Sequence, residues 1–236
     1  MSSGTSNNPY TAPAAEPHPT PNVGLQGPYG AFRKNGTLKN VIVAFLVLDA
    51  MMCIFNTGIL NYMDMRQYED ASYLATDETS ELDSVIQISA LSQVALNVTL
   101  IVLFCVWMNR SCKNAWLLDP PRMTTTPGWS VGYFFIPILM LWKPYSSMKE
   151  IRSASYGKDH PLKSVMPLWW TLWLITSFIG NITFRLYASA DPDKYLMASK
   201  LDLVATPLNV ILNYLAITLV TGITLAQERR LVHWHQ

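Results

Sequence analysis

The chain has 236 residues, a formal net charge of +1, 50% apolar residues and only 14% charged residues. Soluble domains carry about a quarter charged residues, so this composition excludes an ordinary water-soluble protein of one or two domains. The three cysteines are Cys53, Cys105 and Cys112; no CxxC spacing occurs among them, and two lie in apolar runs. They form no disulfide framework, and we expect buried, inert thiols.

Residues 1–37 form a stretch rich in Pro, Ser and Asn. Such a stretch cannot bury enough apolar surface to offset the entropy lost on ordering, so we expect a disordered cytoplasmic tail. It contains no basic region followed by an apolar run, and we therefore expect no cleavable signal peptide. The first apolar segment after it is expected to act as the membrane-targeting signal.

Four apolar segments follow this tail. They occupy residues 41–63, 85–108, 165–187 and 203–226. Each is long enough, at 1.5 Å per residue, to cross a hydrocarbon core of about 30 Å as a helix. Pro207 interrupts the fourth segment early, and residues 227–236 are expected to be a short cytoplasmic tail. The pattern predicts an all-α integral membrane protein whose membrane domain covers residues 38–226.

A fifth apolar stretch, residues 129–142, is shorter than the roughly 17–25 residues that a spanning helix needs, and Pro137 interrupts it. Without a crossing there, the chain has four transmembrane helices and both termini on one side. That side then holds all of the 17 Lys and Arg residues except Arg66, Arg185, Lys194 and Lys200. A fifth crossing would remove this bias. The positive-inside rule therefore predicts four helices with both termini in the cytoplasm.

Residues 126–151 accordingly become a cytoplasmic-side motif that dips into the membrane and returns, or lies along its surface. Gly128 and Gly132 would permit the close packing that irregular backbone needs at membrane depth. After Lys143, the spacing of Met148 and Ile151 predicts a short interfacial helix. The candidate functional residues of this motif are Trp129, Gly132, Pro137, Lys143, Pro144 and Tyr145.

Asp49 is the sharpest candidate inside the expected spans. It lies about 12 Å along the first segment, near the bilayer midplane. An ionised carboxylate there costs about 3 kcal/mol unless it is paired, so Asp49 should face the other helices or be protonated. Two interpretations remain open: an ion or proton relay site, or a protonated side chain that hydrogen-bonds to a neighbouring helix.

Further polar residues lie within the other segments. Gln93 with Asn97, and Asn209 with Asn213, are spaced by four and share a helix face. Such side chains are common hydrogen-bonding links between membrane helices, and a hydrated pathway is the alternative. Together with Asp49, the candidate intramembrane polar site comprises Asn97, Asn181, Arg185 and Asn213.

The motif TPGWSVGYFFIP followed by LWKPYSSMKEI resembles the signature of a bacterial membrane protein family, domain of unknown function 4328. The upstream run VWMNRSCKNAWLL and the downstream run PLWWTLWLITSFIGNITFRL resemble the same family, and the resemblance extends over residues 41–226. It implies a multipass protein of the bacterial inner, or plasma, membrane. It implies no activity.

The four histidines lie outside the spans, and the sequence contains no nucleophile elbow or Gly-rich phosphate loop. The sequence thus favours a protein without enzymatic activity, cofactor or metal site. We expect the basic cytoplasmic side to bind anionic lipid headgroups rather than nucleic acid. The favoured function is a membrane scaffold or regulatory module that acts through the motif, with a protein partner or a second copy of the chain. The alternative is a small-solute or ion transporter that uses Asp49.

Overall fold

The computed structural model describes residues 26–63, 65, 79–157, 164–189 and 191–233. Four long helices dominate it. They are α1 (Gly36–Cys53), α3 (Thr79–Leu118), α6 (Met166–Tyr187) and α7 (Pro192–His233). A π-helical segment, η1 (Ile54–Leu60), continues α1 without a break. The fold is all-α, as predicted, apart from one very short hairpin.

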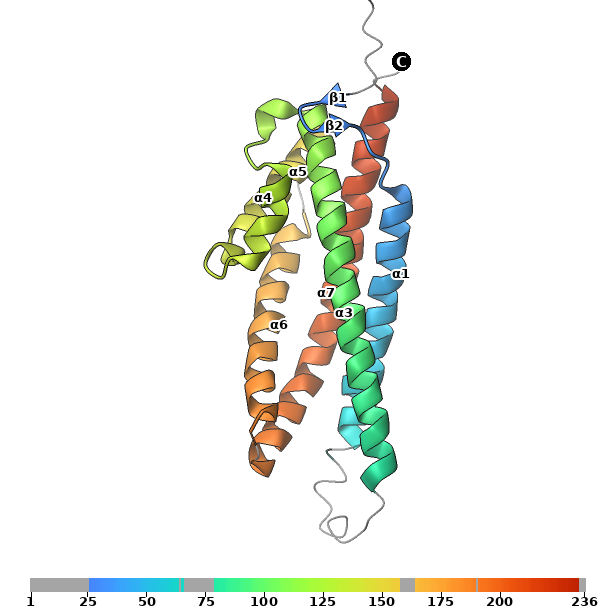
Figure 1. Cartoon of the computed structure of the whole chain (residues 1–236), viewed down its shortest axis with the longest axis vertical. Coiled ribbons are helices and arrows are strands. Elements are labelled where there is room, and N and C mark those ends of the chain that lie inside the picture. The colour runs from blue at the N-terminus through green and yellow to red at the C-terminus, as the bar shows by residue number, and fades with distance from the viewer. Residues whose placement is uncertain (1–25, 64, 66–78, 158–163, 190, 234–236) are drawn as a thin grey trace, which may run out of the picture.

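The long helices run alternately in opposite directions (Figure 1). The start of α1 and the end of α7 therefore lie at one end of the bundle, which we call the motif end because residues 126–151 pack there. The start of α7 and the end of α6 lie at the opposite end, which we call the far end. This arrangement is the one that four antiparallel crossings would produce.

Three helices are long and apolar enough to cross a membrane. They are Gly36–Met63, Ser84–Leu118 and Pro192–Val232. The fourth expected segment, residues 165–187, forms helix α6 with nearly the predicted bounds. Its tryptophans, with Asn181 and Arg185, dilute its apolar content, and it is not among the three.

The outward surface of the bundle is unusually apolar. Large apolar side chains are exposed on all four long helices and on η1: Val47 and Met51 on α1; Ile59 on η1; Ile88, Leu91, Val94, Val98 and Ile101 on α3; Leu168, Phe178 and Phe184 on α6; Val204, Ile211 and Tyr214 on α7. Monomeric soluble proteins rarely expose contiguous apolar surface of this extent, whereas hydrocarbon chains match it. The band is compatible with a membrane protein.

The ends of the chain are more ordered than the sequence indicates. Of the expected tail 1–37, residues 1–25 lie outside the described residues, but β1 (Gln26–Gly27) and β2 (Gly30–Ala31) pair in antiparallel fashion. Tyr29 between them packs edge-on against Trp116 of α3, with ring centroids 5.4 Å apart. The expectation of disorder is therefore wrong for residues 26–37. Helix α3 extends beyond the predicted apolar segment, and the hairpin packs against that extension.

The helices likewise extend beyond the expected spans. Helix α3 continues past Met108 to Leu118, and α7 runs unbroken through Pro207 to His233. The expected polar tail 227–236 is therefore wrong for its first part, since Gln227 is buried in the bundle. Contacts among these extensions, rather than hydrocarbon, stabilise them.

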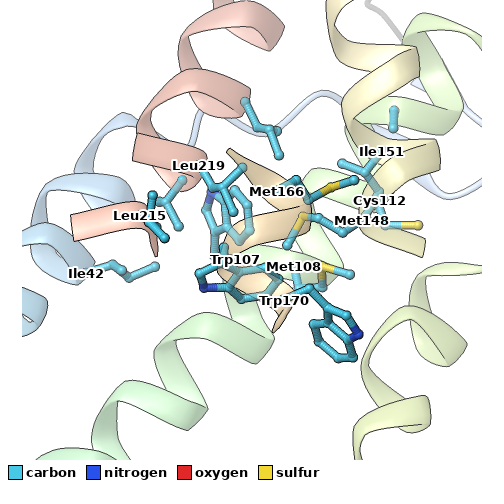
Figure 2. Close-up of a cluster of buried hydrophobic side chains, with 14 of the residues drawn as sticks. Ile42, Trp107, Met108, Cys112, Met148, Ile151, Met166, Trp170, Leu215 and Leu219 are labelled. Carbon is cyan, nitrogen blue, oxygen red and sulfur yellow. The ribbon is translucent and has the colours of Figure 1, made fainter. Parts of the chain in front are cut away.

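The core is concentrated toward the motif end. Figure 2 shows its buried side chains, contributed by all the long helices and by the motif: Ile42, Trp107, Met108, Cys112, Met148, Ile151, Met166, Trp170, Leu215 and Leu219. Trp107 is fully buried, and its indole Nε1 donates to Thr224 Oγ1 of α7 at 3.0 Å. This cluster joins the motif to α1, α3 and α7.

Candidate functional site

The motif is a chain of short helical pieces rather than one helix. Thr126 caps α4 (Pro127–Gly132), where Pro127 occupies the first turn and its missing N–H costs nothing. The 3₁₀ turns η4 (Tyr133–Phe135) and η5 (Leu139–Leu141) follow, separated by extended backbone at Ile136. Helix α5 (Lys143–Tyr156) then begins with Pro144 in its first turn.

Glu150 connects the two ends of the motif, which we call its base. Its carboxylate accepts the backbone N–H groups of Thr124 and Thr125, each at 2.9 Å, and the hydroxyl of Thr124 at 2.6 Å. Ser147 Oγ also lies 3.4 Å from Thr125 Oγ1. The two ends of the motif therefore meet, and residues 129–142 fold back instead of running across the bundle.

These bonds affect the pKa of Glu150. Burial alone raises the pKa of its carboxyl, but the hydrogen bonds from Thr124 and Thr125 outweigh burial and leave the pKa below its ordinary value. A lowered folded-state pKa stabilises the folded motif fully above the ordinary glutamate pKa of about 4.3. The stabilisation is lost as the pH falls through the lowered value.

Glu150→Gln is expected to speed hydrogen exchange at the Thr124 and Thr125 amides at neutral pH. The neutral amide keeps only one acceptor oxygen and loses the charge-assisted bonds. Hydrogen–deuterium exchange read by mass spectrometry on the segment containing both residues measures this. Glu228→Gln, on α7, is the control and should leave that segment unchanged. Equal exchange in wild type and Glu150→Gln would contradict the role of Glu150.

The inner side of the motif packs on the tryptophans of α6. Trp170 Nε1 donates to the carbonyl of Leu141 at 3.1 Å. Trp170 and Trp173 stack with centroids 4.8 Å apart, and Phe134 meets Trp173 edge-on at 6.2 Å. Tyr145 lies tilted against Trp170 at 6.3 Å. The Trp-rich run therefore positions the motif as well as the start of α6.

The outer side of the motif is apolar and exposed. Phe135 and Ile138 are 69% and 68% exposed. The other large apolar residues exposed there are Trp129, Leu141 and Trp142. Together these five side chains form what we call the motif tip. Pro137 is exposed with them, and Lys143 Nζ sits 5.6 Å above the ring of Tyr133.

The expected role of two glycines is wrong. A Cβ placed on Gly128 would meet nothing within 4 Å, and one on Gly132 would make only an ordinary contact with the Trp129 ring at 3.5 Å. Close packing instead occurs at Gly222 of α7, where a Cβ would lie 2.7 Å from the hydroxyl of Tyr156. Gly222 therefore sets the approach of α5 to α7.

Helix α5 is more deeply packed than an interfacial helix. Met148 and Ile151 are buried as expected, but Arg152 is also only 6% exposed. Its guanidinium lies 5.2 Å from the centroid of the Tyr156 ring. Burial lowers the pKa of Arg152, yet an arginine stays protonated, so a cation is held inside this end of the bundle.

A buried network of amides and hydroxyls joins α7 to α3 and α5. Gln227 Nε2 donates to Ser111 O and to Ser155 Oγ, both at 2.9 Å, and its Oε1 accepts from Asn114 Nδ2 at 3.1 Å. Asn114 also exchanges two bonds with the backbone of Arg33 at 2.9 and 3.0 Å. One side chain, Gln227, thus connects three segments that are far apart in sequence.

Asp49 lies in a second polar cluster, deeper in the bundle. It is 8% exposed, and both carboxylate oxygens accept hydrogen bonds: Gln93 Nε2 donates to Oδ1 at 2.6 Å and Asn213 Nδ2 to Oδ2 at 2.8 Å. Both donors are side-chain amides, so each oxygen of the Asp49 side chain has one hydrogen-bond partner. Asp49 therefore links α1 to α3 and α7.

The polar contacts continue from Asp49 toward the far end. Gln93 Oε1 accepts from Asn56 Nδ2 at 3.3 Å, and the same Nδ2 lies 3.3 Å from Ser89 O. Asn56 and Ser89 line a cleft of about 310 Å³. Asp49, Gln93 and Asn56 form what we call the polar chain. The buried core that contains Trp107 and Leu215 lies toward the motif end.

The structure brings together only part of the predicted intramembrane site. Asp49 and Asn213 meet directly. Asn97 and Asn181 are exposed and donate within their own helices, to Gln93 O at 3.0 Å and Ser177 O at 2.9 Å. Arg185 is exposed in the last turn of α6. Asn97, Asn181 and Arg185 are thus not members of the Asp49 cluster.

Sequence reasoning missed the contribution of Asn56, Thr57 and Thr206. Thr57 Oγ1 and Thr206 Oγ1 lie 2.5 Å apart between η1 and α7. A polar pattern in 41–63 was visible, but the π-helical segment shifts the phase of these residues relative to an α-helix. No group of three or more potential metal ligands occurs within the described part of the chain.

The fold and the motif define an all-α protein with three helices of membrane-spanning length and a fold-back motif at one end. A family model described as Domain of unknown function (DUF4328) matches residues 71–225, about two thirds of the sequence, and the chain belongs to this family. The match includes the motif, Gln93 and Asn213, whereas Asp49 precedes it. No curated protein and no solved structure matches the chain.

Proposed function

We propose that the chain is a multipass protein of the plasma membrane, the inner membrane if the source is bacterial, with four spans and both termini in the cytoplasm. The fourth span is α6. Its 22 residues would cover about 33 Å, and it lies along α7 in antiparallel orientation (Figure 1). Leu168, Phe178 and Phe184 continue the exposed apolar band along it. The charge bias of the sequence supports a cytoplasmic motif end.

Two exposed residues on either side of α6 test this topology. Lys149→Cys on α5 should react with a membrane-impermeant maleimide only in inside-out vesicles, and Asp193→Cys on α7 only in intact cells. Both changes are made after replacing the natural Cys53, Cys105 and Cys112 by alanine. Reaction of both positions from the same side would refute the crossing of α6.

We infer that the protein is a non-enzymatic membrane scaffold or regulatory module that acts through the motif. The observation that carries this proposal is the contrast between the two sides of the motif. Its base is fixed by Glu150 and by the α6 tryptophans, while its tip presents five large apolar side chains to the surroundings. A rigidly held apolar tip at the inner leaflet suits recognition of a transmembrane partner, with the remainder of the tip in lipid.

A matched pair of phenylalanines tests this proposal. Phe135 at the motif tip and Phe178 on α6 are both 69% exposed. A photo-crosslinking amino acid at position 135 should yield a discrete protein adduct in native membranes, whereas the same probe at position 178 should capture lipid. Only lipid adducts from both positions would contradict a scaffold that acts through the motif.

The polar chain supports a second candidate function, transport of a small solute or ion. Hydrogen bonds through Gln93 and Asn56 connect Asp49 to the lining of the far-end cleft. The core around Trp107 closes the other side, so this conformation would be the outward-facing state of a transporter rather than an open channel.

Asp49→Asn is the direct test of transport. The protein in liposomes should dissipate an imposed ion gradient, and the variant should lose at least about tenfold of that rate, because an amide cannot carry the charge. Asp193→Asn, at an exposed position on α7, is the control and should transport normally. Absence of any flux through the wild-type protein would leave the scaffold as the only candidate.

A further inference from the structure

The far-end cleft lies between η1, α3, α6 and α7. Its lining combines apolar side chains with a few polar groups: Asn56, Thr57, Leu60, Asn61, Ile86, Ser89, Ala90, Tyr187, Tyr195 and Asp202. Tyr187 and Tyr195 meet edge to face with centroids 5.3 Å apart. Asp202 is the one carboxylate among the described residues of this lining.

The hydrogen-bond donors of the cleft are already used by the protein. Asn56 Nδ2 donates to Gln93 and Ser89, and Asn61 Nδ2 donates to Ser199 O at 3.0 Å. Tyr187 Oη donates to Asp202 Oδ2 at 3.0 Å. A ligand that needs donors, such as an anion, finds few of them here.

Acceptor capacity, in contrast, remains. Asn56 Oδ1 is buried and has no hydrogen-bond partner among the described residues. The polar chain sets the orientation of the Asn56 amide. Gln93 uses its N–H group for Asp49, so its Oε1 is directed to Asn56 and accepts from Asn56 Nδ2. Asp202 has no salt bridge within the described part of the chain, and a carboxylate accepts up to about four bonds.

We propose that the far-end cleft binds a primary ammonium group, with Asp202 as its counter-ion. An R–NH₃⁺ group supplies N–H donors for the remaining acceptors of the cleft and a positive charge for the Asp202 carboxylate. The rings of Tyr187 and Tyr195 add the negative faces that attract cations. The apolar lining from Leu60, Ile86 and Ala90 suits the carbon chain of an amine better than a hydrated metal ion. The site goes beyond the proposed scaffold function, and it requires no transport of the ligand.

The ammonium group has two possible sources, a soluble alkylamine or the headgroup of phosphatidylethanolamine. Full-length protein in nanodiscs of phosphatidylglycerol alone should bind ethylammonium saturably, as followed by ligand-observed NMR. Tetramethylammonium, which carries charge but no N–H, should bind about tenfold more weakly. Adding phosphatidylethanolamine to the nanodiscs should displace ethylammonium if the lipid is the occupant and leave its binding unchanged if a soluble amine is.

Asp202→Asn should weaken ethylammonium binding by about tenfold or more, because it removes the counter-ion and keeps an oxygen for Tyr187. Asp193→Asn, on the same helix outside the cleft, should bind as wild type does. Tyr195→Leu should weaken binding less, and its folding is checked by its melting temperature. No saturable binding by wild type, or equal binding by wild type and Asp202→Asn, would overturn the proposal, and neither result bears on crosslinking at Phe135.

Discussion

Trp107→Ala is expected to lower the free energy of unfolding by about 3–5 kcal/mol. Trp107 is fully buried, and its ring lies 5.4 Å from that of Phe104. Its truncation leaves a cavity in the cluster of Figure 2 and an unused Thr224 hydroxyl. Equilibrium unfolding in mixed micelles of increasing SDS content measures the loss. Trp107→Phe, which keeps most of the ring volume, should lose less.

Trp142→Ala provides the matched control for this prediction. Trp142 belongs to the motif tip and is 47% exposed. Its removal leaves no enclosed cavity, so we expect a change below about 1 kcal/mol. Equal losses of unfolding free energy for Trp107→Ala and Trp142→Ala would contradict the expectation that the core at the motif end contributes more to stability than the motif tip.

Gln227→Leu is expected to destabilise the protein by about 2–4 kcal/mol, since it leaves Asn114 Nδ2, Ser111 O and Ser155 Oγ with one partner fewer. Leucine is nearly isosteric with glutamine, so the lost free energy of unfolding comes from the missing hydrogen bonds and not from a change in side-chain volume. The same SDS titration measures it, and hydrogen exchange in α5 should rise.

Gln87→Leu is the corresponding control. Gln87 lies on α3 and is exposed, so leucine there should be neutral or slightly stabilising in a membrane-like environment. If Gln227→Leu proved as stable as Gln87→Leu, the buried network would be a consequence of the fold rather than a cause of its stability.

Much of the architecture was predictable because hydrophobic length is a strong signal. Residues 165–187 were predicted within one residue of α6, and the brevity of 129–142 correctly indicated a stretch that does not run across the bundle. Helix ends were less predictable. The extension of α3 beyond Met108 and the last turns of α7 contain many polar residues, and long-range contacts such as the bond between Asn114 and Gln227 connect them across the bundle. A single sequence does not reveal such long-range pairing.

For the candidate site, the sequence indicated which polar residues matter better than it indicated which residues hydrogen-bond to one another. Asp49 was singled out by the cost of burying a carboxylate, and that argument needs no structure. Spacing by four correctly placed Gln93 and Asn97 on one face, but it does not say which helix that face meets. Asn97 consequently joined the predicted site, although it bonds within its own helix, whereas Gln93 is the residue that reaches Asp49.

The last turns of α7 have a consequence for the order in which the protein assembles during synthesis. Arg230 donates to the carbonyls of Ala154 and Leu118, and Gln227 completes the bonds of Ser111 and Asn114. All four acceptors and donors are made long before residues 227–230 leave the ribosome. The motif end therefore cannot close fully until residues 227–230 have been made, and a chain that stops at residue 226 would lack all of these contacts between α7, α3 and α5.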